Sequence, residues 1–208
     1  MDEEAIYAAR IELVDFLIEA LWDTPSEAFV DNLLSGEIRI PAEGVDDDLD
    51  TGFRKLERFI AHNEDRPVED VRTDLKREYT RVFVGPRPPV MAHETHYREG
   101  MEFLGKGKAE IEASYGAAGW NPPEEYPEEA DFVAVELAFL RWLIARQRGG
   151  MEEAFGYERV FLEEHMTHWI DDCAADIVEF ADSDFYAAVG HLLSGVVAFE
   201  YELAGQMA

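Results

Sequence analysis

The 208-residue chain carries 46 acidic and 18 basic side chains, so its formal net charge is −28 at pH 7. Nucleic acid and anionic membrane surfaces are poor partners for such a chain, because phosphate contacts need a basic patch and the sequence shows none. Its 47% content of hydrophobic residues excludes a disordered acidic tail and predicts one globular domain over residues 1–208.

The excess of acid has two interpretations. Acidic residues run from the first segment to the last, and the basic residues include only the lysines Lys55, Lys76, Lys106 and Lys108. An evenly acidic surface favours adaptation to a cytoplasm of molar salt, as in a halophile, and the alternative is a surface that attracts cationic partners. At ~1 M salt the Debye length is about 3 Å, so ligand affinity would then depend on apolar contacts.

The cysteine content and the N-terminus limit the kinds of site and the location that we expect for the chain. Cys173 is the only cysteine, which excludes an internal disulfide and a cysteine-rich zinc site. No basic region followed by an apolar run begins the chain, and the sequence contains no apolar stretch long enough to span a membrane. We therefore expect a soluble cytoplasmic protein without stable membrane insertion.

Apolar residues recur at three- and four-residue steps in the first half of the chain, which is the spacing of amphipathic helices. Helices are predicted over residues 6–21, 25–36, 53–60 and 71–83, and residues 37–49 are predicted as an acidic loop with a brief extended piece at 38–40. The run Thr24-Pro25-Ser26-Glu27 predicts the start of the second helix, with Thr24 as its cap. Gly85-Pro86 ends the fourth helix, because proline disfavours helical geometry at the residue before it.

The second half of the chain continues the helical pattern. Helical spacing resumes over residues 101–115, and residues 132–144 are apolar on more than one face, which predicts a central helix. One or two helices are predicted over residues 151–181 and a last one over 185–204. No segment alternates as a strand does, so the sequence predicts an all-α bundle of roughly seven to nine helices.

Catalytic signatures are absent from the sequence. It has no glycine-rich phosphate loop and no Gly-x-Ser-x-Gly turn, and none of its histidines follows a glutamate by three residues as in helical di-iron sites. His93/His96 and His165/His168 could each chelate a divalent ion from one helix face. We favour the alternative that one histidine of a pair packs inward while the other is solvated. The sequence predicts no enzyme, no metal and no cofactor.

The region from residue 78 onward carries a family resemblance. The segments EYTRVFVGPRPP (78–89) and HETHY (93–97) resemble the TorD/DmsD family of redox-enzyme maturation chaperones. In that family a helix ends in Tyr-x-x-Leu-Phe-x-Gly-Pro, and a proline-rich loop then leads to Tyr-Glu-Ser-x-Tyr. Residues 131–140 are similar to the helix after the family's Pro-Asp-His block, 161–169 to its Phe-x-x-x-His-x-x-x-Trp helix, and Phe185-Tyr186 to the start of its last helix.

Two departures from the family pattern bear on function. The chain has His93-Glu94-Thr95 in place of Tyr-Glu-Ser, which keeps the acid and a hydroxyl but removes an aromatic ring. It has Ala130-Asp131-Phe132 in place of Pro-Asp-His, so only the aspartate is kept. Nucleotide or cofactor handling that depends on the family's histidine is therefore not carried over to this chain.

The resemblance implies a chaperone that binds the twin-arginine signal peptide and the apo form of a molybdopterin oxidoreductase of the DMSO/TMAO-reductase type. The stiff loop would form one wall of a peptide groove, with Glu94, Asp131 and Glu136 at its rim. The alternative is that Glu94 caps a helix and that Asp131 forms hydrogen bonds within the fold. The predicted peptide-binding residues are Tyr79, Phe83, Gly85, Pro86, Pro89, Glu94, Tyr97, Asp131, Glu136, His165 and Trp169.

Two other functions are compatible with the sequence. One is an assembly chaperone for a nitrate reductase, which differs from the first function only in its client. The other is a helical-bundle metalloenzyme that uses His165, His168 and a nearby carboxylate. The sequence does not decide whether the chain forms a homodimer.

Overall fold

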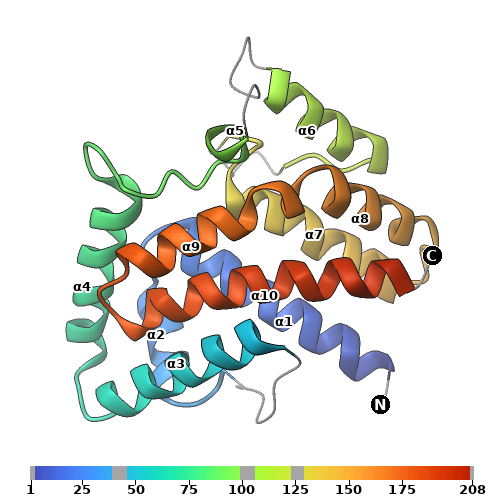
Figure 1. Cartoon of the computed structure of the whole chain (residues 1–208). Coiled ribbons are helices and arrows are strands. Elements are labelled where there is room, and N and C mark those ends of the chain that lie inside the picture. Colours follow the sequence, from blue (N-terminus) through green and yellow to red (C-terminus); the bar gives the residue numbers. More distant parts are fainter. Residues whose placement is uncertain (1–2, 39–45, 99–105, 123–128, 207–208) are drawn as a thin grey trace. The chain divides into compact units, whose positions relative to one another are not determined.

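The computed structural model describes residues 3–38, 46–98, 106–122 and 129–206, and this part of the chain is built from ten α-helices (Figure 1). Among these residues the only β-type pairing is an isolated antiparallel bridge between His93 and Phe132, so the predicted all-α class is confirmed. The helices are α1 (Glu3–Trp22), α2 (Glu27–Leu34), α3 (Asp47–Asn63), α4 (Val68–Tyr79), α5 (Glu94–Tyr97), α6 (Lys106–Ala118), α7 (Val133–Arg148), α8 (Glu153–Glu164), α9 (Ile170–Phe180) and α10 (Asp184–Gln206).

The predicted count of roughly seven to nine helices is too low. The additional helix is α5, which spans only Glu94–Tyr97 and lies in the segment that was predicted as loop. A helix of four residues makes about one turn, so it has no repeating apolar face that periodicity could detect. The extended piece predicted at 38–40 and the start of the helix predicted at 101–115 lie largely outside the described residues.

The chain divides into two compact units. Unit 1 comprises Met1–Ile18, Ala92–Asp171 and Val196–Ala208, and unit 2 comprises Glu19–Met91 and Asp172–Gly195. Unit 1 therefore holds α5 to α8 with the beginning of α1 and the end of α10, and unit 2 holds α2 to α4 with most of α9. The prediction of one domain over residues 1–208 stays a prediction.

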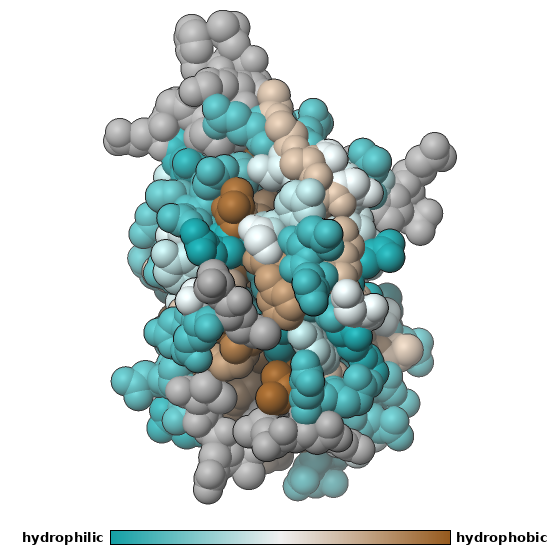
Figure 2. Space-filling model, turned by 90° about the vertical axis from the view of Figure 1, so that its right-hand side faces the viewer, coloured by the Kyte–Doolittle hydropathy of each residue, from teal (hydrophilic) through white to brown (hydrophobic). Residues whose placement is uncertain are grey.

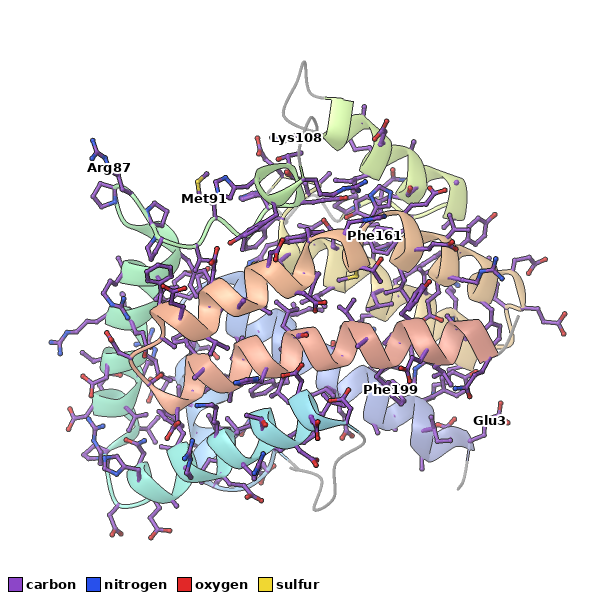
Figure 3. The ribbon with its side chains drawn as sticks, in the orientation of Figure 1. Glu3, Arg87, Met91, Lys108, Phe161 and Phe199 are labelled. Atoms are coloured by element: carbon purple, nitrogen blue, oxygen red, sulfur yellow. The ribbon has the colours of Figure 1, made fainter. Side chains whose placement is uncertain are left out.

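Helix α7 forms the core of unit 1. It packs against α8, which also contacts α6 (Figure 1). Side chains on all faces of α7 are buried, as the apolar run over 132–144 predicted, and they include Val133, Val135, Leu137, Phe139, Leu140, Leu143 and Ile144. Figure 3 shows Phe161 of α8 beneath α6, where its ring lies 5.9 Å from that of Tyr115.

A buried ionic network joins four helices of unit 1. Arg10 of α1 is 5% exposed, and its guanidinium donates to both carboxylate oxygens of Glu200 on α10, at 2.6–3.1 Å. It also donates to Glu158 of α8 at 2.8 Å and to the side-chain oxygen of Gln147 on α7 at 3.1 Å. Gln147 in turn donates to Glu158 at 2.6 Å. One cation thus pairs with two buried carboxylates, and moving α1, α8 or α10 away from the others would separate buried ionic partners.

In unit 2, α2 packs against α3 and α4, and Gly190 of α10 allows that helix to approach α9 closely. A Cβ atom at Gly190 would lie 2.8 Å from the carbonyl oxygen of Ala174 and 2.7 Å from a methyl carbon of Val178. Any larger residue at this position would force the two helices apart. The glycine is therefore required by packing.

The start of α2 and the end of α4 can be compared with the residues predicted to begin and end these helices. The cap of α2 is Ser26, whose hydroxyl accepts from the Phe29 N–H at 3.1 Å, so the prediction of Thr24 as the cap is wrong. Helix α4 continues as a π-helical turn over Thr80–Val84, and the helical backbone stops at Gly85. The predicted end of the fourth helix at Gly85-Pro86 is therefore confirmed. The Gly85 N–H donates to the Thr80 carbonyl at 2.8 Å.

The side chains on the face drawn in Figure 2 are mostly hydrophilic, in keeping with the net charge of −28. Hydrophilic residues flank this face on both sides, and apolar residues show between them along its middle. Among the described residues, none of the helices combines the length and the apolar character that crossing a membrane requires.

Candidate functional site

Two segments of unit 1 are joined by a short backbone pairing that positions the candidate site. The Glu94 N–H donates to the Asp131 carbonyl at 3.0 Å, and the Val133 N–H donates to the Ala92 carbonyl at 2.9 Å. Helix α5 begins on one side of this pairing and α7 on the other. Three carboxylates, Glu94, Asp131 and Glu136, are consequently held within the same region of the unit, and each is fully buried.

Asp131 is held by hydrogen bonds from the opposite segment. Its carboxylate accepts from the hydroxyl of Thr95, and from the Thr95 N–H at 3.4 Å. His93 Nδ1 lies 3.3 Å from its other oxygen. Burial by itself raises the pKa of Asp131, but the hydrogen bonds from His93 and Thr95 outweigh it and lower the pKa below the ordinary value. Asp131 is thus an ionised carboxylate that caps the first turn of α5.

Glu94 connects α5 to the end of α8. Its carboxylate oxygens lie 3.1 and 3.2 Å from Nδ1 of His165, and it accepts a hydrogen bond from Arg98 one turn further along the chain. Arg98 also donates to the Glu164 carbonyl at 2.8 Å. The other ring nitrogen of His165, Nε2, is 2.9 Å from the hydroxyl of Ser114 on α6. Glu94 and His165 therefore tie three helices together.

Glu136 is the least compensated of the three acids. Its Oε2 accepts from the indole N–H of Trp169 at 3.2 Å, and among the described residues its Oε1 has no hydrogen-bond partner. Burial, followed by the nearby charges of Glu94 and Asp131, raises the pKa of Glu136 well above its ordinary value, although the Trp169 hydrogen bond opposes the shift. This environment favours the neutral, protonated form of Glu136.

The prediction that three carboxylates lie at the exposed rim of a groove is wrong. Glu94, Asp131 and Glu136 were expected at a solvent-facing edge, and all three are inside unit 1. The alternative that Asp131 forms hydrogen bonds within the fold describes what the structure shows. Burying a carboxylate costs free energy unless it is paired or protonated, so these acids can hold the α5 turn in place but do not face solvent.

The predicted site residues fall into two groups. Glu94, Tyr97, Asp131, Glu136, His165 and Trp169 come together in unit 1, where the ring of Tyr97 is stacked 5.8 Å from that of Trp169. Tyr79, Phe83, Gly85, Pro86 and Pro89 belong to unit 2.

In unit 2 the aromatic residues of this group form a cluster of their own. Tyr79 lies 5.0 Å from Phe83, and its hydroxyl donates to the Leu21 carbonyl at 3.1 Å. Phe83 also lies 5.8 Å from the ring of Tyr186. Val84, at the end of the π-helical turn, and Met91, in the loop that follows, are exposed, and Figure 3 shows Arg87 pointing outward from this loop.

Sequence reasoning missed several partners of the buried acids. Arg98 follows Glu94 by one helical turn, so the spacing of opposite charges could have revealed this pair. Ser114 and the Arg10 network carried no local signal, because their partners lie far away in the sequence. The interpretation of the second histidine pair is confirmed, since His165 is buried and His168 is exposed.

A family model described as the nitrate reductase delta subunit matches residues 43–175, which is more than half of the chain. The chain belongs to this family. The matched region contains the motif segment 78–97 and the 161–169 helix, so the predicted relation to the TorD/DmsD chaperones is confirmed. The protein named "Chaperone protein TorD" from Vibrio parahaemolyticus is 33% identical over 93 residues, which cover 42% of this chain and 43% of that protein. The aligned part is thus less than half of either chain.

Proposed function

We propose that this family member is a non-enzymatic cytoplasmic chaperone. It would bind the twin-arginine signal peptide of a molybdopterin oxidoreductase and hold the apo form until the cofactor is inserted. The observation that carries the proposal is the family match over residues 43–175, together with the similarity to a protein named as a chaperone.

In this proposal the buried acids position the binding surface and do not contact the peptide arginines directly. Glu94 and Asp131 fix the α5 turn from two sides, through His165 and Thr95 respectively. The turn then presents Tyr97, which is half-buried and whose ring stacks on that of Trp169. A pre-ordered aromatic side chain binds an apolar peptide segment with little loss of conformational entropy. The five predicted residues of unit 2 stay predicted peptide contacts.

The direct test is a titration of the tag-free chain with twin-arginine peptides from its own genome, at high salt, by fluorescence anisotropy. We expect at least one peptide to bind, and we expect Tyr97→Ala to weaken binding about tenfold or more, because truncating a central aromatic contact costs about 2 kcal/mol. Tyr201→Ala is the matched control, since Tyr201 is an exposed tyrosine of the same unit. If no peptide binds the folded chain, the proposed function is wrong.

Salt screening predicts which peptide variants bind most weakly. At ~1 M salt, charges more than about 3 Å apart are largely screened, so replacing apolar residues of the peptide should weaken binding more than replacing its arginine pair. The opposite ranking would show that the acidic surface itself attracts the peptide.

The client is the least constrained part of the proposal. The family description names a nitrate reductase, whereas the similar Vibrio protein is a TorD chaperone, so a nitrate reductase and a DMSO/TMAO-type reductase are both candidates. Binding of each candidate's signal peptide, measured side by side, would decide between them. Gel filtration with light scattering would show in the same samples whether the chain forms a homodimer.

The structure gives the metalloenzyme alternative little support. A chelating His165/His168 pair needs a free ring nitrogen on each histidine. Both ring nitrogens of His165 already lie within hydrogen-bond distance of Glu94 and Ser114, and His168 is on the exposed side of its 3-10 turn.

A further inference from the structure

Three side chains of unit 1 come together without being neighbours in sequence. His93, Glu129 and Asp131 each offer one ligand atom, and these atoms lie within 4.8 Å of one another. We propose that they form a binding site for a divalent transition-metal ion, with Zn²⁺ as the preferred occupant. The site shares His93 with the first His-x-x-His pair but does not use His96, and its existence does not depend on peptide binding.

The backbone holds two of the ligands in place. The antiparallel bridge between His93 and Phe132 sets the His93 segment directly against the Asp131 segment. Asp131 is fully buried and is oriented by the hydroxyl and the N–H of Thr95. Metal-binding carboxylates are characteristically held by such hydrogen bonds, which reduce the entropy lost when the ion binds.

The third ligand leaves the site accessible. The side chain of Glu129 is 60% exposed and that of His93 is 26% exposed, so an ion can enter from solvent. Zn²⁺ needs its ligand atoms at about 2.0–2.2 Å, which requires the three to converge from their present separation. Rotation of the exposed Glu129 side chain, with Asp131 kept fixed, supplies that movement.

Lys108 provides the competing positive charge. Its ammonium bonds to Oε2 of Glu129, and its side chain is 36% exposed on a flexible stem. A dication placed between Glu129 and Asp131 interacts more strongly with two carboxylates than a single ammonium does. Lys108 must therefore leave Glu129 when the ion binds, and removing its charge should increase the affinity.

The donor set determines the class of ion. One imidazole nitrogen with two carboxylate oxygens suits Zn²⁺ and neighbouring transition metals, whereas Mg²⁺ and Ca²⁺ prefer sites made only of oxygen. We expect Zn²⁺ to bind more tightly than Mn²⁺, and Mg²⁺ to compete poorly even in large excess.

The experiment is isothermal titration of the full, tag-free chain with ZnCl₂ at fixed ionic strength. We expect one ion per chain, with affinity about tenfold or more lower in His93→Gln and in Glu129→Gln, because losing a ligand costs at least as much as losing a supporting hydrogen bond. Lys108→Met should bind more tightly than the wild type. His191→Gln should not change affinity, and it is the matched control because His191 pairs with Asp48 at 2.9 Å in unit 2.

Glu129 and Lys108 are both accessible, so these two variants keep the test informative if His93→Gln folds poorly. Circular dichroism checks the fold of each variant. The proposal is overturned if no stoichiometric ion binds, if His93→Gln and Glu129→Gln bind like the wild type, or if Lys108→Met binds more weakly.

Discussion

The buried network around Arg10 should make the stability of the chain depend on pH through Glu158. Burial, and then the neighbouring charge of Glu200, raises the pKa of Glu158 from 4.5 to about 7, although Arg10 and Gln147 oppose the shift. Because the folded-state pKa is raised, the folded chain binds this proton more tightly than the unfolded chain does. Stability from this proton is therefore complete below pH 4.5 and is lost as pH rises through about 7.

The size of the effect follows from the shift. A displacement from 4.5 to about 7 corresponds to on the order of 3 kcal/mol in the free energy of unfolding. The pH-insensitive variant Glu158→Gln should lack this contribution, since its amide is neutral at every pH. The replacement also alters hydrogen bonds, which changes the free energy of unfolding by an amount that does not depend on pH. The quantity to measure is therefore how the difference in free energy of unfolding between wild type and variant varies with pH.

The assay is urea denaturation of the wild type and Glu158→Gln at several pH values from 4.5 to 8.5, in the same salt. The variant should gain on the order of 3 kcal/mol relative to the wild type between the acidic and the alkaline end. Glu163→Gln, which changes an exposed acid of the same helix, is the control and should give a nearly constant difference. A constant difference for Glu158→Gln, or a gain at acidic pH, would refute the reasoning.

Three further changes test the packing and the buried charges, each by urea denaturation. Arg10→Met should destabilise the chain by about 3–5 kcal/mol at pH 8, since it leaves two buried carboxylates without their cation; a loss below ~1 kcal/mol would contradict the ionic network. Gly190→Ala should cost about 1–3 kcal/mol because its Cβ would meet a backbone carbonyl, and a neutral result would mean that α9 and α10 separate freely. Glu136→Gln should change stability by less than about 1 kcal/mol in mildly acidic buffer, because burial favours the neutral form of this acid, whereas Asp131→Asn should cost about 1–3 kcal/mol in the same buffer by weakening the hydrogen bonds with Thr95 and His93. Equal costs for the two acid variants would contradict the opposite directions of their pKa shifts.

Local sequence signals were reliable where the structure depends on neighbouring residues. The Gly85-Pro86 stop is where it was predicted, because proline restricts the residue before it whatever the rest of the chain does. Helix α7 was recognised as central from its apolar faces. The cap of α2 was displaced by two residues, since Thr24 and Ser26 are both able to cap and only the observed backbone conformation selects Ser26.

At the candidate site, local sequence patterns did not predict the burial of the acidic residues. The family resemblance pointed to Glu94 and Asp131 as peptide-binding residues, and the structure places both in the same part of unit 1. Their burial was not predicted. A buried charge needs hydrogen-bond or ionic partners, and several of the partners here are distant in the sequence, so local patterns do not reveal them. Glu94 finds His165 from 71 positions away, and Asp131 finds Thr95 from 36 positions away.

By itself, the sequence determined the helical class, the approximate positions of most helices, the acidic composition and the family relation, since each of these depends on spacing, composition or ordered motifs. The boundaries were less well determined, because α3 already begins at Asp47, inside the loop predicted over residues 37–49. Only the tertiary structure decided which acids leave water and what neutralises them. Arg10 meets Glu200 across 190 positions, and His93 meets Asp131 through a backbone pairing of two loops. The physical reason is that helix formation responds to contacts within a turn or two, whereas the free energy of a buried charge depends on every group that the fold brings around it.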